Sequence, residues 1–210
     1  MKKNLLILAL MTVSLTVQAQ HEEGDLTIQP RVGVTFSTIT DQDDIKMKTN
    51  LTYGFETEYY FTNTMSIAGG IVFTNQGYKF DYYEGVEPGG NSVKKTAYFD
   101  NYYATVPITF NYYLVDGLAI KAGVQPSFRV KTRLKVDDRK MDLDEALNFL
   151  FGIQEVTLNK FDFSIPIGFS YEYNNIVIDA RYNFGLIKLF KGFDNSSRNS
   201  VIALTLGYKL

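Results

Sequence analysis

Long stretches in which apolar and polar residues alternate are the feature that most constrains the fold of this chain. Between residues 98 and 130, apolar side chains recur at every second position on both sides of an Asp116-Gly117 turn. This two-residue period is typical of a strand with unlike faces. Each run exceeds an ordinary strand of about five to six residues and is long enough for the roughly nine to eleven residues of a tilted membrane-spanning strand. The segment therefore predicts a membrane-spanning hairpin.

The same alternation recurs along the chain and predicts eight strands. Their connections are short at 62–64, 115–117 and 174–175, and long at about 38–51, 81–97, 135–157 and 191–199. Bacterial outer-membrane barrels have this asymmetry, with short periplasmic turns and long extracellular loops. We therefore expect an all-β fold, an eight-stranded antiparallel up-and-down transmembrane β-barrel over residues 26–210. The DLDEALNFLFG segment of the third long loop predicts a short helix with a capping box.

Two motifs carry a resemblance to a known family. The run VPITFNYYL…GLAIKAGVQPSF starts at Val106 and joins a Val-Pro strand to a strand with a G-x-Q-P pattern, and RYNFGL starts at Arg181. In these motifs and in strand spacing, nearly the whole mature chain resembles the PorT-like outer-membrane β-barrel family of Bacteroidetes. The resemblance implies a role in protein secretion or cell-surface interaction, with a secretion-system or extracellular protein as partner. A narrow porin or channel and a soluble lipocalin-like ligand carrier remain alternatives.

The amino terminus predicts export. Lys2 and Lys3 precede an apolar stretch, and Val17-Gln18-Ala19 matches a cleavage site, so residues 1–19 are predicted to be a signal peptide and 20–25 a periplasmic leader. After cleavage the chain would reach the outer membrane of a Gram-negative bacterium. Its closing LGYKL sequence resembles the strand signal read by the barrel-assembly machinery. Outer-membrane lipid and this machinery are therefore expected partners.

Composition argues against several other classes of protein. The net charge of -2 and the pI near 5.5 argue against a nucleic-acid partner, which normally requires a basic surface. There is no cysteine, which excludes disulfides and thiolate metal sites. The one histidine, His21, lies in the predicted leader, so we expect no Ser-His or Asp-His dyad within the barrel. The sequence therefore predicts a protein that is not an enzyme.

The loop acids do not predict a metal site. Asp41, Asp43 and Asp44 lie close together, but they lack the glycine and the terminal glutamate of an EF-hand loop. Asp137, Asp138 and Asp142 fall in another long loop, where acids usually form a solvated surface. We expect no cofactor and no bound metal.

Glycine placement indicates which face of the strands is inside. Nearly all strand glycines share the parity of the polar residues, as expected if that face is the crowded interior of a narrow barrel. An eight-stranded barrel is just wide enough for side chains to fill it, and buried charges need partners. We therefore expect a lumen that is closed to solutes by paired charges. The predicted lumen charge network comprises Arg31, Glu56, Glu58, Lys121, Arg129, Asp162, Glu172, Asp179 and Arg181.

Aromatic residues on the opposite parity gather near the strand ends. Membrane barrels carry girdles of aromatic residues at both interfaces, whereas aromatic strand propensity alone does not explain placement at strand ends. The predicted periplasmic girdle, next to the short turns, comprises Tyr59, Phe61, Tyr112, Tyr171, Tyr173 and Tyr208. A second group near the long loops comprises Phe36, Tyr102, Phe128, Phe163 and Phe184.

Overall fold

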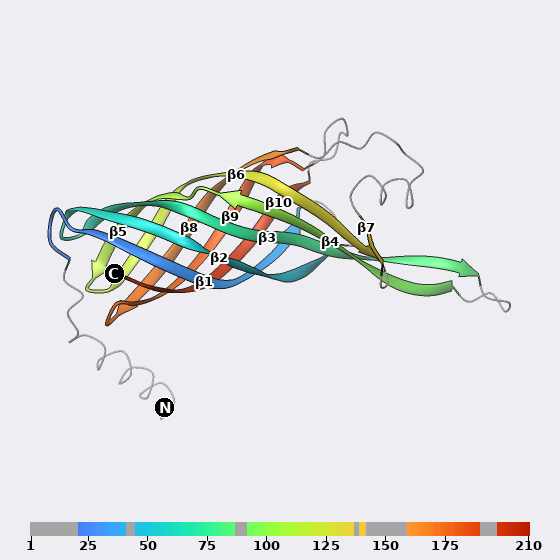
Figure 1. Cartoon of the computed structure of the whole chain (residues 1–210), viewed down its shortest axis with the longest axis horizontal. Coiled ribbons are helices and arrows are strands. Elements are labelled where there is room, and N and C mark those ends of the chain that lie inside the picture. The colour runs from blue at the N-terminus through green and yellow to red at the C-terminus, as the bar shows by residue number, and fades with distance from the viewer. Residues whose placement is uncertain (1–20, 41–44, 87–91, 137–138, 142–158, 190–196) are drawn as a thin grey trace, which may run out of the picture.

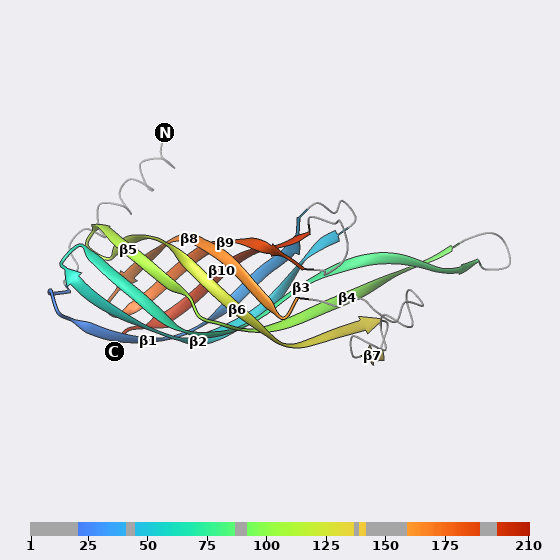
Figure 2. The same ribbon diagram turned by 90° about the horizontal axis from the view of Figure 1, so that it is seen from above.

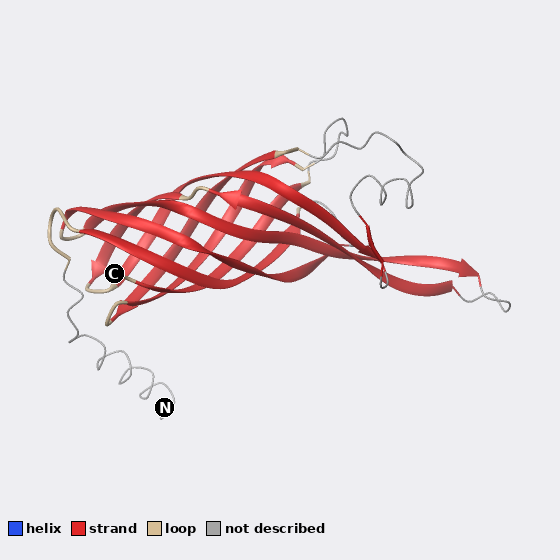
Figure 3. Cartoon of the chain, viewed as in Figure 1, coloured by secondary structure: helices blue, strands red, loops and turns tan. Residues whose placement is uncertain are grey.

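The computed structural model describes residues 21–40, 45–86, 92–136, 139–141, 159–189 and 197–210, and these residues form ten strands and no helix (Figures 1 and 3). The strands are β1 (Leu26–Ile39), β2 (Ile45–Thr62), β3 (Met65–Val86), β4 (Ser92–Thr105), β5 (Ile108–Val115), β6 (Leu118–Val136), β7 (Arg139–Met141), β8 (Phe161–Tyr173), β9 (Ile176–Lys188) and β10 (Arg198–Tyr208). The described residues include no helix of the length and hydrophobicity that crossing a membrane requires.

The strands close into an antiparallel barrel. β1 pairs with both β2 and β10, and the ring continues through β9, β8 and β6 to β3. β4 and β5 lie end to end between β3 and β6, so the ring has the eight strand positions predicted from the sequence. The fold is therefore an up-and-down all-β barrel.

The sequence predicted one continuous strand where the structure has β4 and β5. The division falls at Val106-Pro107, because proline has no N–H to donate to a ladder. The register against β3 nevertheless continues, from Thr105 opposite Val72 to Ile108 opposite Gly69. The predicted single strand is therefore two strands, which together occupy the one predicted position in the barrel.

Tight turns close one end of the barrel, which we call the short-turn end. Asn174 and Asn175 both have positive φ, 46° and 67°, as the predicted two-residue hairpin requires. Gly117 has φ 78°, and a Cβ on it would lie 2.4 Å from the carbonyl oxygen of Glu172. Glycine is therefore required in this turn.

The faces of the barrel strands are apolar outside and polar inside. Val32, Phe55 and Ile71 are exposed on the outer surface, whereas Thr35 and Thr52 are buried within. This arrangement is the reverse of a soluble lipocalin-type barrel, so the lipocalin-like alternative is wrong.

The opposite end, which we call the long-strand end, differs from the prediction. Long loops were expected at about 81–97 and from 135, but β3 continues to Val86, β4 starts at Ser92 and β6 continues to Val136, where β7 pairs with it. Figures 1 and 2 show these strands projecting beyond the barrel. β2 and β10 also start earlier than predicted, at Ile45 and Arg198. We call residues 78–86 and 92–99 of β3 and β4 the strand extension.

An apolar core lies at the long-strand end. It comprises the buried residues Ile39, Tyr78, Ala97, Phe99, Leu134 and Leu189. The Tyr78 and Phe99 rings are stacked, with centroids 4.9 Å apart. The interior of the molecule is therefore polar within the barrel and apolar at its long-strand end.

Several predicted features lie outside the described residues. They are the signal peptide of residues 1–19, the helix predicted in the segment 142–152, and the acidic groups at 41–44 and at Asp137, Asp138 and Asp142.

Candidate functional site

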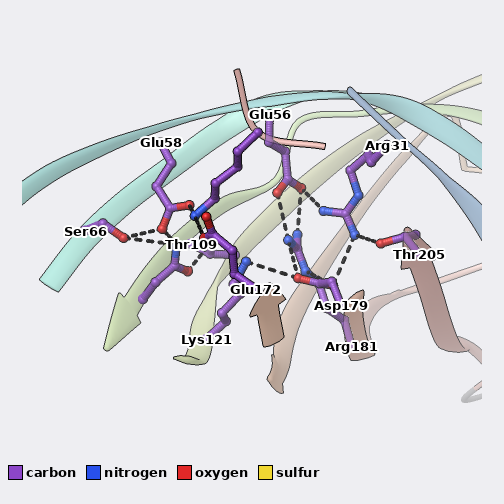
Figure 4. Close-up of polar contacts among 12 residues, drawn as sticks. Arg31, Glu56, Glu58, Ser66, Thr109, Lys121, Glu172, Asp179, Arg181 and Thr205 are labelled. Carbon is purple, nitrogen blue, oxygen red and sulfur yellow. Dashed lines mark hydrogen bonds and ion pairs between the residues drawn. The ribbon is translucent and has the colours of Figure 1, made fainter. Parts of the chain in front are cut away.

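The lumen holds a cluster of buried charges contributed by β1, β2, β6 and β9 (Figure 4). Arg181 forms two parallel hydrogen bonds with Glu56, each 2.7 Å, and its Nε lies 2.8 Å from Asp179. Arg31 joins the same two carboxylates, at 2.6 Å from Glu56 and 3.1 Å from Asp179. Lys121 Nζ lies 3.1 Å from Asp179. We call these five residues the central cluster.

A glycine on the neighbouring strand β8 makes room for the central cluster. Gly168 on β8 is the register partner of both Lys121 and Arg181. A Cβ on Gly168 would lie 3.0 Å from Arg181 Cγ and only 2.2 Å from the carbonyl oxygen of Ala180. Glycine between the two long cations therefore lets their side chains pass across the lumen.

A second cluster closes the lumen at the short-turn end. Lys209 Nζ lies 3.0 Å from Glu58 and 2.7 Å from Glu172. It also donates to the hydroxyls of Tyr60 and Tyr113, which lie 2.8 Å apart. We call these five residues the short-turn cluster. The sequence prediction missed Lys209, although its alternation with Tyr208 and Leu210 had already indicated that it faces inward.

The two clusters are neutral when taken together. Four cations, Arg31, Lys121, Arg181 and Lys209, meet four carboxylates, Glu56, Glu58, Glu172 and Asp179. Neutral side chains take the remaining acceptor sites: Asn111 donates to Glu58 at 2.7 Å, and Tyr113 does so at 2.8 Å. Such pairing compensates for much of the cost of removing charges from water.

Two residues of the predicted network lie apart from both clusters. Asp162 accepts hydrogen bonds from Asn199, at 2.8 Å, and from the backbone N–H of Phe163, at 2.9 Å. Arg129 is half-buried on β6, opposite Tyr103 in register. The structure thus brings seven of the nine predicted residues together and leaves Asp162 and Arg129 nearer the long-strand end.

His21 packs into the mouth of the barrel at the short-turn end. Its ring stacks on Tyr60, with centroids 4.1 Å apart, and its Nε2 lies 3.1 Å from Glu172. The predicted leader therefore brings this histidine into the mouth of the barrel, a contact that the sequence analysis did not predict. Chain order could not reveal this contact, because 151 residues separate His21 from Glu172.

Little space remains in the lumen beside the central cluster. The cavity there, which Arg31, Glu56 and Arg181 help to line, has a volume of about 30 Å³. One water needs roughly 10–15 Å³, so the cavity has room for a water or two. Among the described residues, no group of three or more His, Cys, Asp or Glu side chains is placed to hold a metal ion.

The six predicted girdle residues lie on the outer surface toward the short-turn end. Tyr59, Tyr112, Tyr173 and Tyr208 are exposed, and Phe61 and Tyr171 are half-buried. The ring of Phe61 packs against that of Phe110, with centroids 5.8 Å apart. Their placement is suited to an interfacial girdle.

A family comparison accounts for the fold. Residues 18–191 match the model of the outer membrane protein beta-barrel domain. The chain belongs to this family. It is therefore an outer-membrane β-barrel protein.

The chain is also similar to several solved structures at low sequence identity. Ail, the attachment invasion locus protein of Yersinia pestis, is 16% identical with a TM-score of 0.48, over 90% of this chain and 99% of that chain. OprG from Pseudomonas aeruginosa is 14% identical with a TM-score of 0.47, over 91% of this chain and 98% of that chain. Neisserial surface protein A is 14% identical with a TM-score of 0.47, over 88% of this chain and 97% of that chain. No curated protein matches the chain.

Proposed function

We propose that this outer-membrane barrel is a closed, non-enzymatic anchor that presents its strand extension to a protein partner, in protein secretion or in cell-surface interaction. The observation that carries the proposal is the continuation of paired β3 and β4 beyond the barrel, with register partners from Tyr78–Phe99 to Val86–Ser92. At about 3.4 Å per residue, the eight steps from Tyr78 to Val86 reach roughly 27 Å. Such an extension offers backbone and side chains to a partner.

The filled lumen supports an anchor in preference to a transport path. The central cluster and the short-turn cluster lie within the barrel, and the apolar core lies at its long-strand end. A solute would have to separate buried ion pairs, at a cost of several kcal/mol for each partner left alone.

We also propose that residues 1–19 are removed on export, which predicts Gln20 as the first residue of the mature protein in amino-terminal sequencing.

The test of the anchor function is a shortened extension. Phe80 and Ala97 are register partners, so an Asn-Gly turn can replace residues 81–96 and close the hairpin between them. The gene is deleted, and the deletion strain is complemented with the wild-type or the shortened protein. The secreted and surface proteins of these strains are then compared. We expect the shortened protein to show normal heat-modifiable gel mobility, which reports a folded barrel, but to fail to restore the secreted or surface proteins. Full restoration would contradict the proposal.

Planar-bilayer recording tests the channel alternative. The purified wild-type protein should show little or no steady conductance, because both clusters are paired across the lumen. Sustained, ion-selective conductance would instead favour a narrow channel in which the same charges select ions.

A further inference from the structure

A groove lies on the outside of the barrel wall where the pairing of β2 with β3 is interrupted. The register passes from Met47–Tyr78 directly to Thr52–Thr74, so β2 has one more residue than β3 in this interval. Such a bulge bends the strand that carries it. On the inner side, Ser37 Oγ on β1 hydrogen-bonds with both the N–H and the C=O of Gly77, each at 2.7 Å. β3 therefore keeps backbone partners where its ladder with β2 is broken.

The groove is large and mainly apolar. Its volume is about 650 Å³, within the range of roughly 300–1,000 Å³ for ligand sites. The apolar lining includes Leu51, Phe73, Tyr102 and Val130, contributed by β2, β3, β4 and β6. Leu51 and Val130 are 66% and 68% exposed, so the groove opens on the outer surface.

Two cations line the same groove. Lys131 and Arg133 are exposed residues of β6, and the Arg133 guanidinium lies 5.6 Å from the centroid of the Tyr102 ring. Neither cation forms an ion pair with a carboxylate in the described part of the chain. Asp100, the register partner of Arg133, is instead bonded by Lys48 and by Asn75. The groove therefore combines apolar walls with uncompensated positive charge.

The groove also lies at the limit of the outer apolar band. On β6, the outward residues Val124 and Phe128 are apolar, and the exposed residues beyond Val130 are Lys131, Arg133 and Lys135. The apolar walls are continuous with the lipid-facing surface, and the cations lie where lipid headgroups begin. A molecule with an acyl chain and an anionic headgroup matches both parts.

We propose that this groove is a binding site for an anionic membrane lipid. Its acyl chain lies along Leu51, Phe73 and Val130, and its headgroup phosphate lies between Lys131 and Arg133. Membrane lipid is the occupant because the groove opens sideways into the bilayer.

A second outer groove provides a matched comparison. It has a volume of about 690 Å³, and its exposed lining is apolar, including Val32, Phe55, Ile71 and Leu206. It has the size of the first groove without the pair of exposed cations. The proposal therefore requires a preference for anionic lipid at the first groove and none at the second.

Tryptophan quenching by brominated lipids measures this preference. The chain has no tryptophan, so Phe128→Trp, beside the first groove, and Phe55→Trp, in the second, each give a single reporter. Each mature variant is reconstituted in vesicles of brominated phosphatidylglycerol or brominated phosphatidylcholine mixed with the unbrominated lipid. Charges near a membrane surface attract anionic lipid by about 1 kcal/mol per cation, so two cations predict a preference of at least about tenfold at Phe128→Trp. We expect no preference at Phe55→Trp.

Charge variants separate the groove from the general charge of the barrel rim. In the Phe128→Trp protein, Lys131→Gln with Arg133→Gln should remove the preference, whereas Lys160→Gln with Lys188→Gln, two exposed cations outside the groove, should leave it unchanged. Equal quenching by the two lipids at Phe128→Trp would overturn the proposal. So would a preference that survives loss of Lys131 and Arg133, or one that appears equally at Phe55→Trp.

Discussion

The two halves of β3 bury opposite kinds of side chain. In the barrel, Ile71 and Phe73 are exposed outside while Gln76 is buried inside; in the strand extension, Tyr78 is buried inside and Asp81 lies outside. Hydrocarbon surrounds the first half, so apolar residues face outward there. Water surrounds the second half, so burying apolar surface again stabilises it. Along β3, the apolar residues therefore lie at outward odd positions up to Phe73 and at inward even positions from Tyr78. This change marks where the strand leaves the membrane.

This contrast implies that the two halves depend on different interactions. The barrel interior depends on ion pairs and hydrogen bonds that leave little buried charge without a partner. The long-strand end depends on the close packing of Leu134, Phe99 and their neighbours. Substitutions that attack one kind of interaction should affect one half far more than the other.

The largest effect is expected from Arg181→Ala in the central cluster. The change leaves Glu56 and Asp179 without their main partner, and removing one member of a buried ion pair costs about 3–5 kcal/mol. The free energy of unfolding should be measured by reversible denaturation in lipid vesicles. Arg129→Ala, on the same barrel but outside the cluster, should cost much less. Equal losses for the two variants would refute the distinction between them.

The next effect tests the outer face of the barrel half. Ile108, the first residue of β5, and Leu204, in the middle of β10, are both exposed on the outer face of the barrel. Arg at such lipid-facing sites costs about 2–4 kcal/mol. Met47 is 48% exposed but is paired with Tyr78 at the start of the extension, so Met47→Arg should change the free energy of unfolding by under about 0.5 kcal/mol. The same assay in vesicles measures all three variants. A silent Leu204→Arg would argue against a hydrocarbon environment for this face.

The third effect tests the apolar half. Leu134 is 1% exposed in the core of the long-strand end, and Leu134→Ala should destabilise this end by about 2 kcal/mol, the low end of the usual range. The loss should appear as faster hydrogen exchange in the strand extension, with exchange in β8 and β9 unchanged. Faster exchange throughout the barrel would show that the two halves unfold together.

The sequence predicted the barrel half well for a physical reason. Alternation persists wherever one face meets hydrocarbon and the other a filled lumen, as in Ile165 to Tyr173 of β8 with Ser170 and Glu172 inside. That pattern determined the strand positions, the inward parity and most of the charged residues of the lumen. It also contained Lys209, which was not included in the predicted network.

The strand extension was missed because its apolar residues do not continue at the alternate positions that they occupy in the barrel half. After Phe73 the apolar residues move from odd to even positions, at Tyr78 and Phe80, and an uninterrupted two-residue period ends there. The prediction therefore placed a long loop at about 81–97, where the structure continues the strand to Val86. The contacts of His21 and of Asp162 were beyond sequence reasoning for another reason, since each depends on which distant side chain fills the neighbouring space.

The smallest effect concerns a charge group on the outside of the extension. Asp81 accepts hydrogen bonds from Lys46 at 2.7 Å and from Thr96 at 2.8 Å, and lies 2.9 Å from Lys94. Hydrogen bonds from the two lysines and Thr96 lower the pKa of Asp81 below its usual value. Because the group is exposed, we expect Asp81→Asn to loosen the pairing of β3 with β4 only slightly. Hydrogen exchange of the extension at pH 7 should be modestly faster than in the wild type.

The direction of the pH dependence follows from the lowered pKa. A carboxylate whose pKa is lower in the folded state contributes stability above its ordinary pKa of about 3.9, and this contribution is lost as the pH falls through the folded value. The difference between wild type and Asp81→Asn, after correction for intrinsic exchange, should therefore shrink as labelling is moved from pH 7 toward pH 3. Asp116→Asn, an exposed acid at the short-turn end, serves as the control and should not alter exchange in the extension at either pH. A difference at Asp81 that stayed constant down to the acid limit would mean that the carboxylate acts by shape and not by charge.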